Sequence, residues 1–140
     1  MIHFTLYTLD GVKFDSDVYE VIVPTMDGVI GILPGHMPLV SVATHGPILV
    51  RHTASQRDDQ RDVFAISGGT VQIENDELRV LVDQADHADD LNEQEVQDAI
   101  ERAKKLKADA KDHISLQHAQ TMIDRHAVRL QVAGMKRRKK

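Results

Sequence analysis

The chain of 140 residues contains no cysteine and no tryptophan, and its few aromatic residues are two Tyr and three Phe. Without cysteine, neither a disulfide framework nor a thiolate metal site can form. With so few aromatic residues, the core has to be built from Val, Ile and Leu, which favour β-sheets. No apolar run reaches the roughly 18 residues of a membrane-spanning helix. Met1–Tyr7 lacks the basic segment and apolar run of a signal or transit peptide, so we expect neither.

Charge is divided unevenly along the chain. Residues 1–90 hold 15 Asp and Glu against 5 Lys and Arg, whereas residues 91–140 hold 7 against 12. Two parts of opposite sign predict two units with different neighbours. The basic run Lys136–Lys140 is typical of a segment that meets nucleic acid, an acidic membrane surface or an acidic patch on a protein.

Short strands separated by turns are predicted over residues 1–86. Ile2, Phe4 and Leu6 alternate with other residues and therefore share one face, and Asp10-Gly11 and Asp27-Gly28 are hairpin-type turn signals. Further apolar runs are Val18–Val23, which Pro24 is expected to end, and Ile48–Arg51, Val63–Ser67, Val71–Glu74 and Leu78–Val82, with Thr53–Asp62 as an exposed loop. The pattern predicts an antiparallel β-sandwich or barrel of about 8 to 10 strands, the first domain of an α+β protein.

Residues 87–140 are predicted to form a second domain, a two-helix antiparallel hairpin. Asn92 is a candidate N-cap with Glu95 as its partner, and Leu91 before the cap can pack on Val96. Gly134 is expected to end the second helix. The segment Asp112–His118 lacks strong helix breakers, so either the turn lies there or the two stripes belong to one longer helix. The two apolar stripes are Val96, Ala99, Ile100, Ala103, Leu106 and Ala110, and Ala119, Met122, Ile123, Ala127, Leu130 and Ala133.

The most specific local signal is a turn bracketed by prolines. Pro34 and Gly35 favour a type II turn over Leu33–His36, because Gly35 tolerates the positive φ of its third position. Pro38 biases Met37 towards extended backbone. The result is a stiff loop that presents its histidine and Met37 to a partner. The plainer interpretation is a tight turn beside an incidentally exposed methionine.

Residues 31–40 resemble G-x-L-P-x-H-x-P-L followed by Val or Leu, a segment of the epsilon subunits of bacterial F-type ATP synthases. Ser67-Gly68-Gly69 is similar to the family's Ser-Gly-Gly, Val80–Ala85 to its last strand, and Arg129–Val132 to the end of its second helix. The resemblance covers nearly the whole chain. It implies a non-catalytic rotor subunit without a cofactor, present once per complex and monomeric when isolated. It also implies a peripheral location at the cytoplasmic face of the cell membrane.

The resemblance further implies that the sandwich binds the gamma subunit at the base of the central shaft and also contacts the c-ring. The subunit thereby couples ring rotation to the shaft during proton-driven ATP synthesis. Where this chain has Val29, the family position is often acidic, so a charged contact with the ring is not expected there. The implied c-ring contacts are Val29, His36, Met37 and Pro38, held by the turn residues Leu33, Pro34 and Gly35.

The family's hairpin can extend into the alpha3beta3 head and inhibit ATP hydrolysis. The matching contacts to the beta and gamma subunits are Met122, Ile123, Arg125, Arg129, Lys136 and Arg137. Some members bind ATP in the compact hairpin through Ile/Leu-Asp-x-x-Arg-Ala, and here Glu95 replaces the arginine, which repels phosphate. The remaining ATP-binding candidates are Asp86, Arg102, Arg125 and Arg129.

Signals for an enzyme are missing, and no catalytic or metal-ligating residue is expected. The sequence has no phosphate-binding loop, Ser67 lacks the first Gly of a nucleophile elbow, and the histidines show no metal-ligand spacing. A rival interpretation is a nucleic-acid-binding protein that uses the basic tail, although the acidic sandwich argues against it. A third is a ligand-binding sandwich with the hairpin as its lid.

Overall fold

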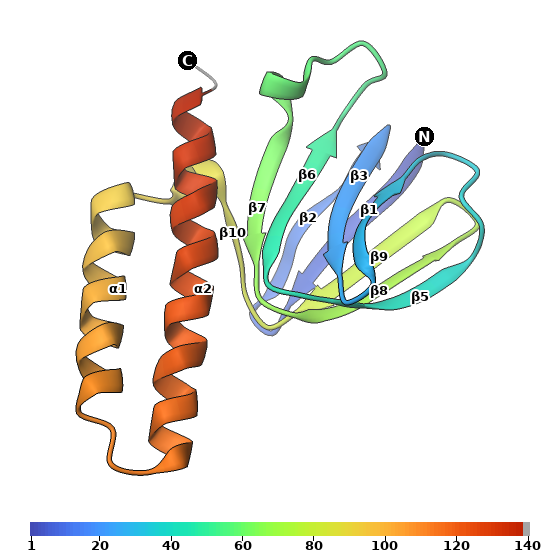
Figure 1. The fold of residues 1–140 in the computed structure, drawn as a ribbon. Helices are drawn as coiled ribbons and strands as arrows, with labels where there is room; N and C mark the ends of the chain where they lie inside the picture. The colour runs from blue at the N-terminus through green and yellow to red at the C-terminus, as the bar shows by residue number, and fades with distance from the viewer. Residues whose placement is uncertain (139–140) are drawn as a thin grey trace.

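The computed structural model describes residues 1–138, with side chains described as far as Met135. In these residues a β-rich body is followed by a pair of long helices (Figure 1). The helices are α1 (Glu93–Ala108) and α2 (His113–Arg138), and two short 3-10 turns, η1 (Asp58–Gln60) and η2 (Ala88–Asp90), precede them. The strands are β1 (Ile2–Thr8), β2 (Gly11–Val18), β3 (Glu20–Thr25), β4 (Gly28–Ile32), β5 (Leu39–Ala43), β6 (Gly46–Arg51), β7 (Asp62–Ile66), β8 (Gly69–Glu74), β9 (Glu77–Val82) and β10 (Ala85–His87).

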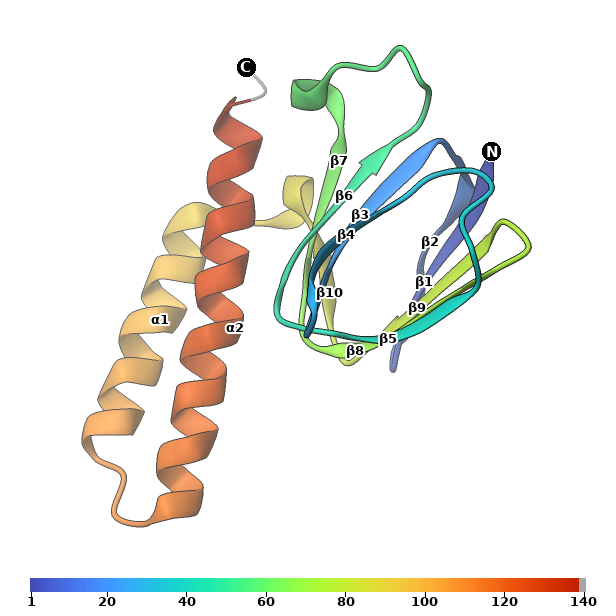
Figure 2. The same ribbon diagram turned by 45° about the vertical axis from the view of Figure 1, so that its right-hand side comes forward.

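The strands form one strongly curved sheet in the order β10-β7-β6-β3-β5-β8-β9-β1-β2, with β4 paired to β3. Among the described strand pairs, β1 with β9 is the parallel one and the others are antiparallel. The curvature folds the sheet into two facing layers (Figure 2). The predicted β-sandwich followed by two helices is therefore confirmed.

The sandwich encloses a core of aliphatic side chains with a small aromatic group. Ile2, Phe4 and Leu6 are fully buried, which confirms that the alternating residues of β1 share the inner face. The Phe14 ring lies 5.3 Å from that of Phe4 and 5.7 Å from that of Phe64, measured between centroids. Such pairs add to the burial of aliphatic groups. The three Phe residues thus suffice because aliphatic side chains fill the rest of the core.

One expected strand end is wrong. Pro24 lies inside β3, and the run Val18–Val23 is divided at Tyr19 between β2 and β3. Proline lacks the N–H that a central strand needs, but β3 changes its partner here from β6 to β5, so the ladder is already interrupted. The Pro24 carbonyl still accepts a hydrogen bond from the Thr44 amide at 3.1 Å.

The helix ends confirm one predicted cap and correct three other points. Asn92 caps α1, because its side chain accepts a hydrogen bond from the Glu95 amide at 3.1 Å. The turn covers residues 109–112 and so overlaps the expected segment only at Asp112, whose side chain accepts a hydrogen bond from the Ser115 amide at 2.7 Å. Because α1 ends at Ala108, Ala110 lies outside the first stripe. Gly134 does not end α2, which continues to Arg138; packing outweighs the poor helix propensity of one glycine.

A second core joins the helices to the sandwich. Ile100 of α1 and Val132 of α2 are buried in one apolar cluster with Val63 and Ala65 of β7, and the remaining buried members are Ala88, Leu91, Val96 and Ala133. The stripes predicted from spacing are partly wrong, since Leu106 and Ala127 are exposed while Val132, left out of the prediction, is fully buried. Figure 1 shows α2 lying between α1 and the sandwich, with the turn of the hairpin projecting beyond the strands. The hairpin is therefore compact and docked in this structure.

Candidate functional site

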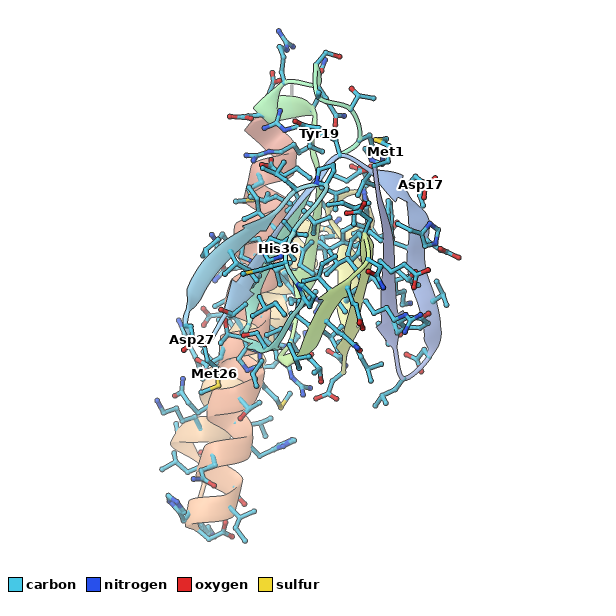
Figure 3. All side chains as sticks on the ribbon, turned by 90° about the vertical axis from the view of Figure 1, so that its right-hand side faces the viewer. Met1, Asp17, Tyr19, Met26, Asp27 and His36 are labelled. Atoms are coloured by element: carbon cyan, nitrogen blue, oxygen red, sulfur yellow. The ribbon has the colours of Figure 1, made fainter. Side chains whose placement is uncertain are left out.

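The six residues 33–38, here called the knob loop, connect β4 to β5 on the side of the sandwich away from the helices (Figure 3). The His36 amide donates to the Leu33 carbonyl at 3.1 Å, and Gly35 has a φ of 82°. Both features belong to the predicted type II turn, which is confirmed. The Nδ1 atom of His36 also lies 2.6 Å from the Met37 carbonyl oxygen. These two contacts within the loop help to hold its backbone.

The backbone of the loop holds the side chain of Met37 out in solvent. Met37 is 72% exposed, Pro38 is also exposed, and His36 is half-buried. Val29, at the other end of β4, is 71% exposed. Because hydrogen bonds already hold the backbone of the loop, binding through Met37 costs little backbone freedom, which favours contact with a partner. The structure therefore presents all four of the predicted contact residues at least partly to solvent.

A second exposed apolar feature crosses the outer face of five strands. The register of β5, β8, β9, β1 and β2 places Val42, Thr70, Leu81, Tyr7 and Val12 side by side, and we call these five residues the outer row. Val42, Leu81 and Val12 are each about half exposed. Contiguous exposed apolar side chains mark protein interaction surfaces. The spacing of single strands could not reveal this row, because it depends on which strands are neighbours.

The hairpin meets the sandwich through charged side chains beside the second core. Arg125 lies 3.7 Å from Asp83, and Arg129 lies 3.1 Å from Asp86. The Nε atoms of both arginines are buried and have no hydrogen-bond partner among the described residues, so charge alone relates them to the carboxylates. The sequence predicted these arginines as contacts to other subunits, whereas in the docked hairpin both point to the sandwich.

His126 lies among these arginines, and their positive charges affect its pKa. Its Nδ1 atom is 3.0 Å from the Nη1 atom of Arg129. Burial lowers the pKa of His126 below its ordinary 6.5, and the positive charges of Arg129, Arg102 and Arg125 lower it further, with Asp86 opposing them. At pH 7, the imidazole of His126 in the docked hairpin is therefore uncharged.

The comparisons with known proteins identify the chain. The family model of the beta-sandwich domain of the ATP synthase delta/epsilon chain matches residues 1–88. The ATP synthase epsilon chain of Halalkalibacterium halodurans is 34% identical over 134 residues, covering 95% of this chain and 97% of the relative. The chain belongs to the ATP synthase delta/epsilon family. The chloroplastic epsilon chain of Piper cenocladum is also 34% identical, over 73% of each chain.

A solved structure agrees in fold with this member of the delta/epsilon family. A chain of the Euglena gracilis mitochondrial ATP synthase, determined with OSCP, F1 and the c-ring, superposes with a TM-score of 0.77 at 20% identity. The match covers 94% of this chain and 80% of that one. Family membership makes the chain a subunit of ATP synthase that is not itself catalytic, and it does not favour the nucleic-acid-binding alternative. No helix within residues 1–138 combines the length and the apolar character needed to cross a membrane.

Sequence reasoning missed one cluster of this epsilon-family chain. The Asp62 carboxylate on β7 receives hydrogen bonds from His52 and, at 3.0 Å, from the Nε2 atom of His87. Burial raises the pKa of Asp62, but the two histidine hydrogen bonds outweigh it and the pKa lies below the ordinary 3.8. The Nδ1 atom of His87 accepts from the Asp89 amide at 3.0 Å, so this histidine also caps η2. The residues lie far apart in sequence, and only the pairing of neighbouring strands brings them together.

The remaining predicted residues are placed as follows. Met122 of α2 and Leu106 of α1 line a surface groove with Arg102, and Ile123 is half-buried. The side chains of Lys136 and Arg137 lie outside the described residues. In the described part of the chain, no three His, Asp or Glu side chains are arranged to hold a metal ion.

Proposed function

We propose that this chain is the central-stalk subunit that joins the gamma subunit to the c-ring and so couples ring rotation to shaft rotation during ATP synthesis. The observation that carries the proposal is Met37, 72% exposed on a loop whose backbone is fixed by hydrogen bonds. The relative from H. halodurans is an ATP synthase epsilon chain, and the Euglena chain was solved together with F1 and the c-ring. A stiff contact transmits torque better than a mobile one, because a flexible loop would bend before the body turned.

In this proposal, two different surfaces of the sandwich bind the two partners. The knob loop, with His36, Met37 and Pro38, contacts the c-ring together with Val29 at the other end of β4. The outer row binds gamma, since its apolar side chains lie across strands that belong to the rigid body of the sandwich. The body is residues 1–86 and the regulatory unit is residues 87–140. As part of F1, the chain is peripheral at the cytoplasmic face of the cell membrane.

The hairpin regulates ATP hydrolysis in this proposal by leaving its docked position and extending along gamma into the alpha3beta3 head. Extension exposes the second core and separates Arg125 from Asp83 and Arg129 from Asp86. The freed arginines, with Met122, Ile123, Lys136 and Arg137, then contact beta and gamma. Moving the hairpin from about 1% to 99% extended takes roughly 5.5 kcal/mol of differential binding. Exposed ion pairs supply only about 0–1 kcal/mol each, so apolar contacts have to supply most of it.

We further propose that the docked hairpin does not bind ATP. The groove that contains Arg102, Arg129 and His126 is also lined by Asp90 and Glu95, whose negative charges oppose phosphate. Arg129 already faces Asp86, and Arg125 already faces Asp83. A bound nucleotide would have to displace both carboxylates. Equilibrium dialysis that shows ATP binding at sub-millimolar concentration would contradict this proposal.

The gamma contact is tested by binding. Leu81→Asp places a charge in the outer row at an exposed position, so the fold is retained while binding to purified gamma weakens about tenfold or more. Ile114→Asp, at the exposed end of the hairpin, is the control and binds gamma like the unsubstituted chain. Equal affinity of both variants for gamma would remove the outer row from the interface.

The ring contact is tested in the assembled synthase. Met37→Asp is expected to lower ATP synthesis without an equal loss of ATP hydrolysis, because a charge replaces the apolar tip of the knob loop. Leu9→Asp is the control. Leu9 is similarly exposed, but it follows the end of β1, whereas the start of β1 lies beside the β8–β9 turn that contacts the knob loop.

Deletion of residues 92–140 should raise the hydrolysis rate, and an unchanged rate would exclude the proposed regulation.

A further inference from the structure

The knob loop is held by a residue that lies far from it in sequence. The Gly35 amide donates a hydrogen bond to the Oδ1 atom of Asp76 at 2.7 Å, across 41 positions of the chain. Asp76 lies in the two-residue turn between β8 and β9, whose flanking residues Glu74 and Glu77 are paired. The bond therefore joins the knob loop, which lies between β4 and β5, to the β8–β9 hairpin.

The same turn is also fixed to a third part of the sandwich. The Asp76 carbonyl accepts a hydrogen bond from the His3 amide at 2.8 Å, at the start of β1. Asp76 thus binds β1 with its main chain and the knob loop with its side chain. A charged acceptor makes the stronger kind of amide hydrogen bond, and the bond is made to the residue at the third position of the type II turn.

The backbone of the turn makes the choice of aspartate informative. Asn75 has a φ of 52° and Asp76 a φ of 59°, the left-handed geometry of a type I′ hairpin turn. Glycine is the residue that fits the second position of such a turn without strain. A glycine there would preserve the hairpin but would offer no acceptor to Gly35. The backbone of the turn therefore does not require a carboxylate at position 76, and the side chain of Asp76 serves the bond to Gly35.

We propose that Asp76 is a positioning residue for the c-ring contact: it braces the knob loop against β1, β8 and β9, the strands that carry most of the outer row. Force applied at Met37 then passes into the sheet directly and not only through the two ends of the loop at Ile32 and Leu39. This inference rests on the proposed function, because it assigns a role to Asp76 in the coupling of ring and shaft. The brace itself is a property of the isolated chain and can be measured there.

Two variants separate the brace from the turn. Asp76→Gly keeps the left-handed backbone and removes the acceptor, whereas Asp76→Asn keeps an acceptor oxygen and a residue type that tolerates this backbone. In the full-length chain, hydrogen exchange of the Gly35 amide, followed by NMR, should become about tenfold faster in Asp76→Gly and stay near the unsubstituted rate in Asp76→Asn. An unchanged rate in Asp76→Gly would overturn the brace.

The second readout is coupling in the assembled synthase. Asp76→Gly should lose ATP synthesis relative to hydrolysis while its affinity for gamma is unchanged, and Asp76→Asn should retain synthesis. If exchange at Gly35 accelerates but synthesis by Asp76→Gly is normal, the positioning role is wrong. The Met37→Asp variant then distinguishes the two failures: loss of synthesis with Met37→Asp leaves the ring contact standing, and normal synthesis with both variants removes the ring contact as well.

Discussion

The Nε atom of Arg129 on α2 lies 3.1 Å from the Oδ2 atom of Asp86 on β10, so the second helix is tied by charge to the last strand of the sandwich. Both side chains are about one-third exposed, and the second core lies beside them. The docked hairpin is therefore held by two different kinds of interaction. Apolar burial does not depend on pH or salt to first order, while the ion pair and the neighbouring His126 do.

Asp86→Asn should weaken docking of the hairpin modestly. Replacing the carboxylate by an amide removes the charge opposite Arg129, with an expected cost of about 1 kcal/mol for a partly exposed pair. Hydrogen exchange of the α2 amides should accelerate, while exchange in β1 stays unchanged. The matched control is Asp27→Asn in the exposed β3–β4 turn, and equal effects of the two substitutions on α2 would show that the ion pair does not support docking.

Two helical isoleucines provide a matched test of the second core. Ile100 is 6% exposed and Ile114 is 79% exposed. Ile100→Ala should destabilise the docked hairpin by about 3 kcal/mol, because it leaves a cavity in the second core. Ile114→Ala should change stability by less than about 0.5 kcal/mol. The measurement is denaturant unfolding followed separately by helix and strand signals, and a large loss in the Ile114 variant would contradict the assigned burial.

Gly69 should not tolerate a side chain. A Cβ atom there would lie 1.9 Å from the Leu81 carbonyl oxygen, which belongs to the neighbouring strand and cannot rotate away. Gly69→Ala is expected to destabilise the sandwich by about 3 kcal/mol or more. Gly31→Ala is the control, because a Cβ at Gly31 meets nothing within 4 Å, and its midpoint in thermal unfolding should stay near that of the unsubstituted chain.

Docking of the hairpin should weaken in mild acid because of His126. Its pKa is lowered in the folded chain, so the unfolded chain binds the proton more tightly and stability falls as the pH drops below the ordinary value of 6.5. The loss is complete once the pH is below the folded pKa. Protonation would add a fourth positive charge beside Arg102, Arg125 and Arg129, opposed by Asp86.

The measurement is the protection of the α2 amides, that is, their exchange relative to the intrinsic rate at each pH, between pH 5 and 8 in the unsubstituted chain and in His126→Gln. In His126→Gln, the protection of the α2 amides should change much less between pH 5 and 8 than it does in the unsubstituted chain. Equal pH dependence in both proteins would show that another group causes it.

Much of the candidate site could be predicted from local sequence. The Pro34-Gly35 turn and the exposure of Met37 follow from backbone preferences within a few residues. The cap at Asn92 is equally local. By contrast, the end of α2 was expected at Gly134 and lies at Arg138, because packing against the sandwich decided it. The brace from Asp76 and the cluster around Asp62 were not predictable, since their partners come from other strands.

Local sequence was enough to predict the β-then-α order, the inner face of β1 and the type II turn of the knob loop, because each depends on residues that are close in the chain. The folded chain was needed to show that the hairpin docks, that Val132 is buried, and which side chains form the outer row. These features depend on strand order and on which helix face meets β7. Turns and caps are local equilibria, whereas burial is settled only when distant segments share the same apolar surface.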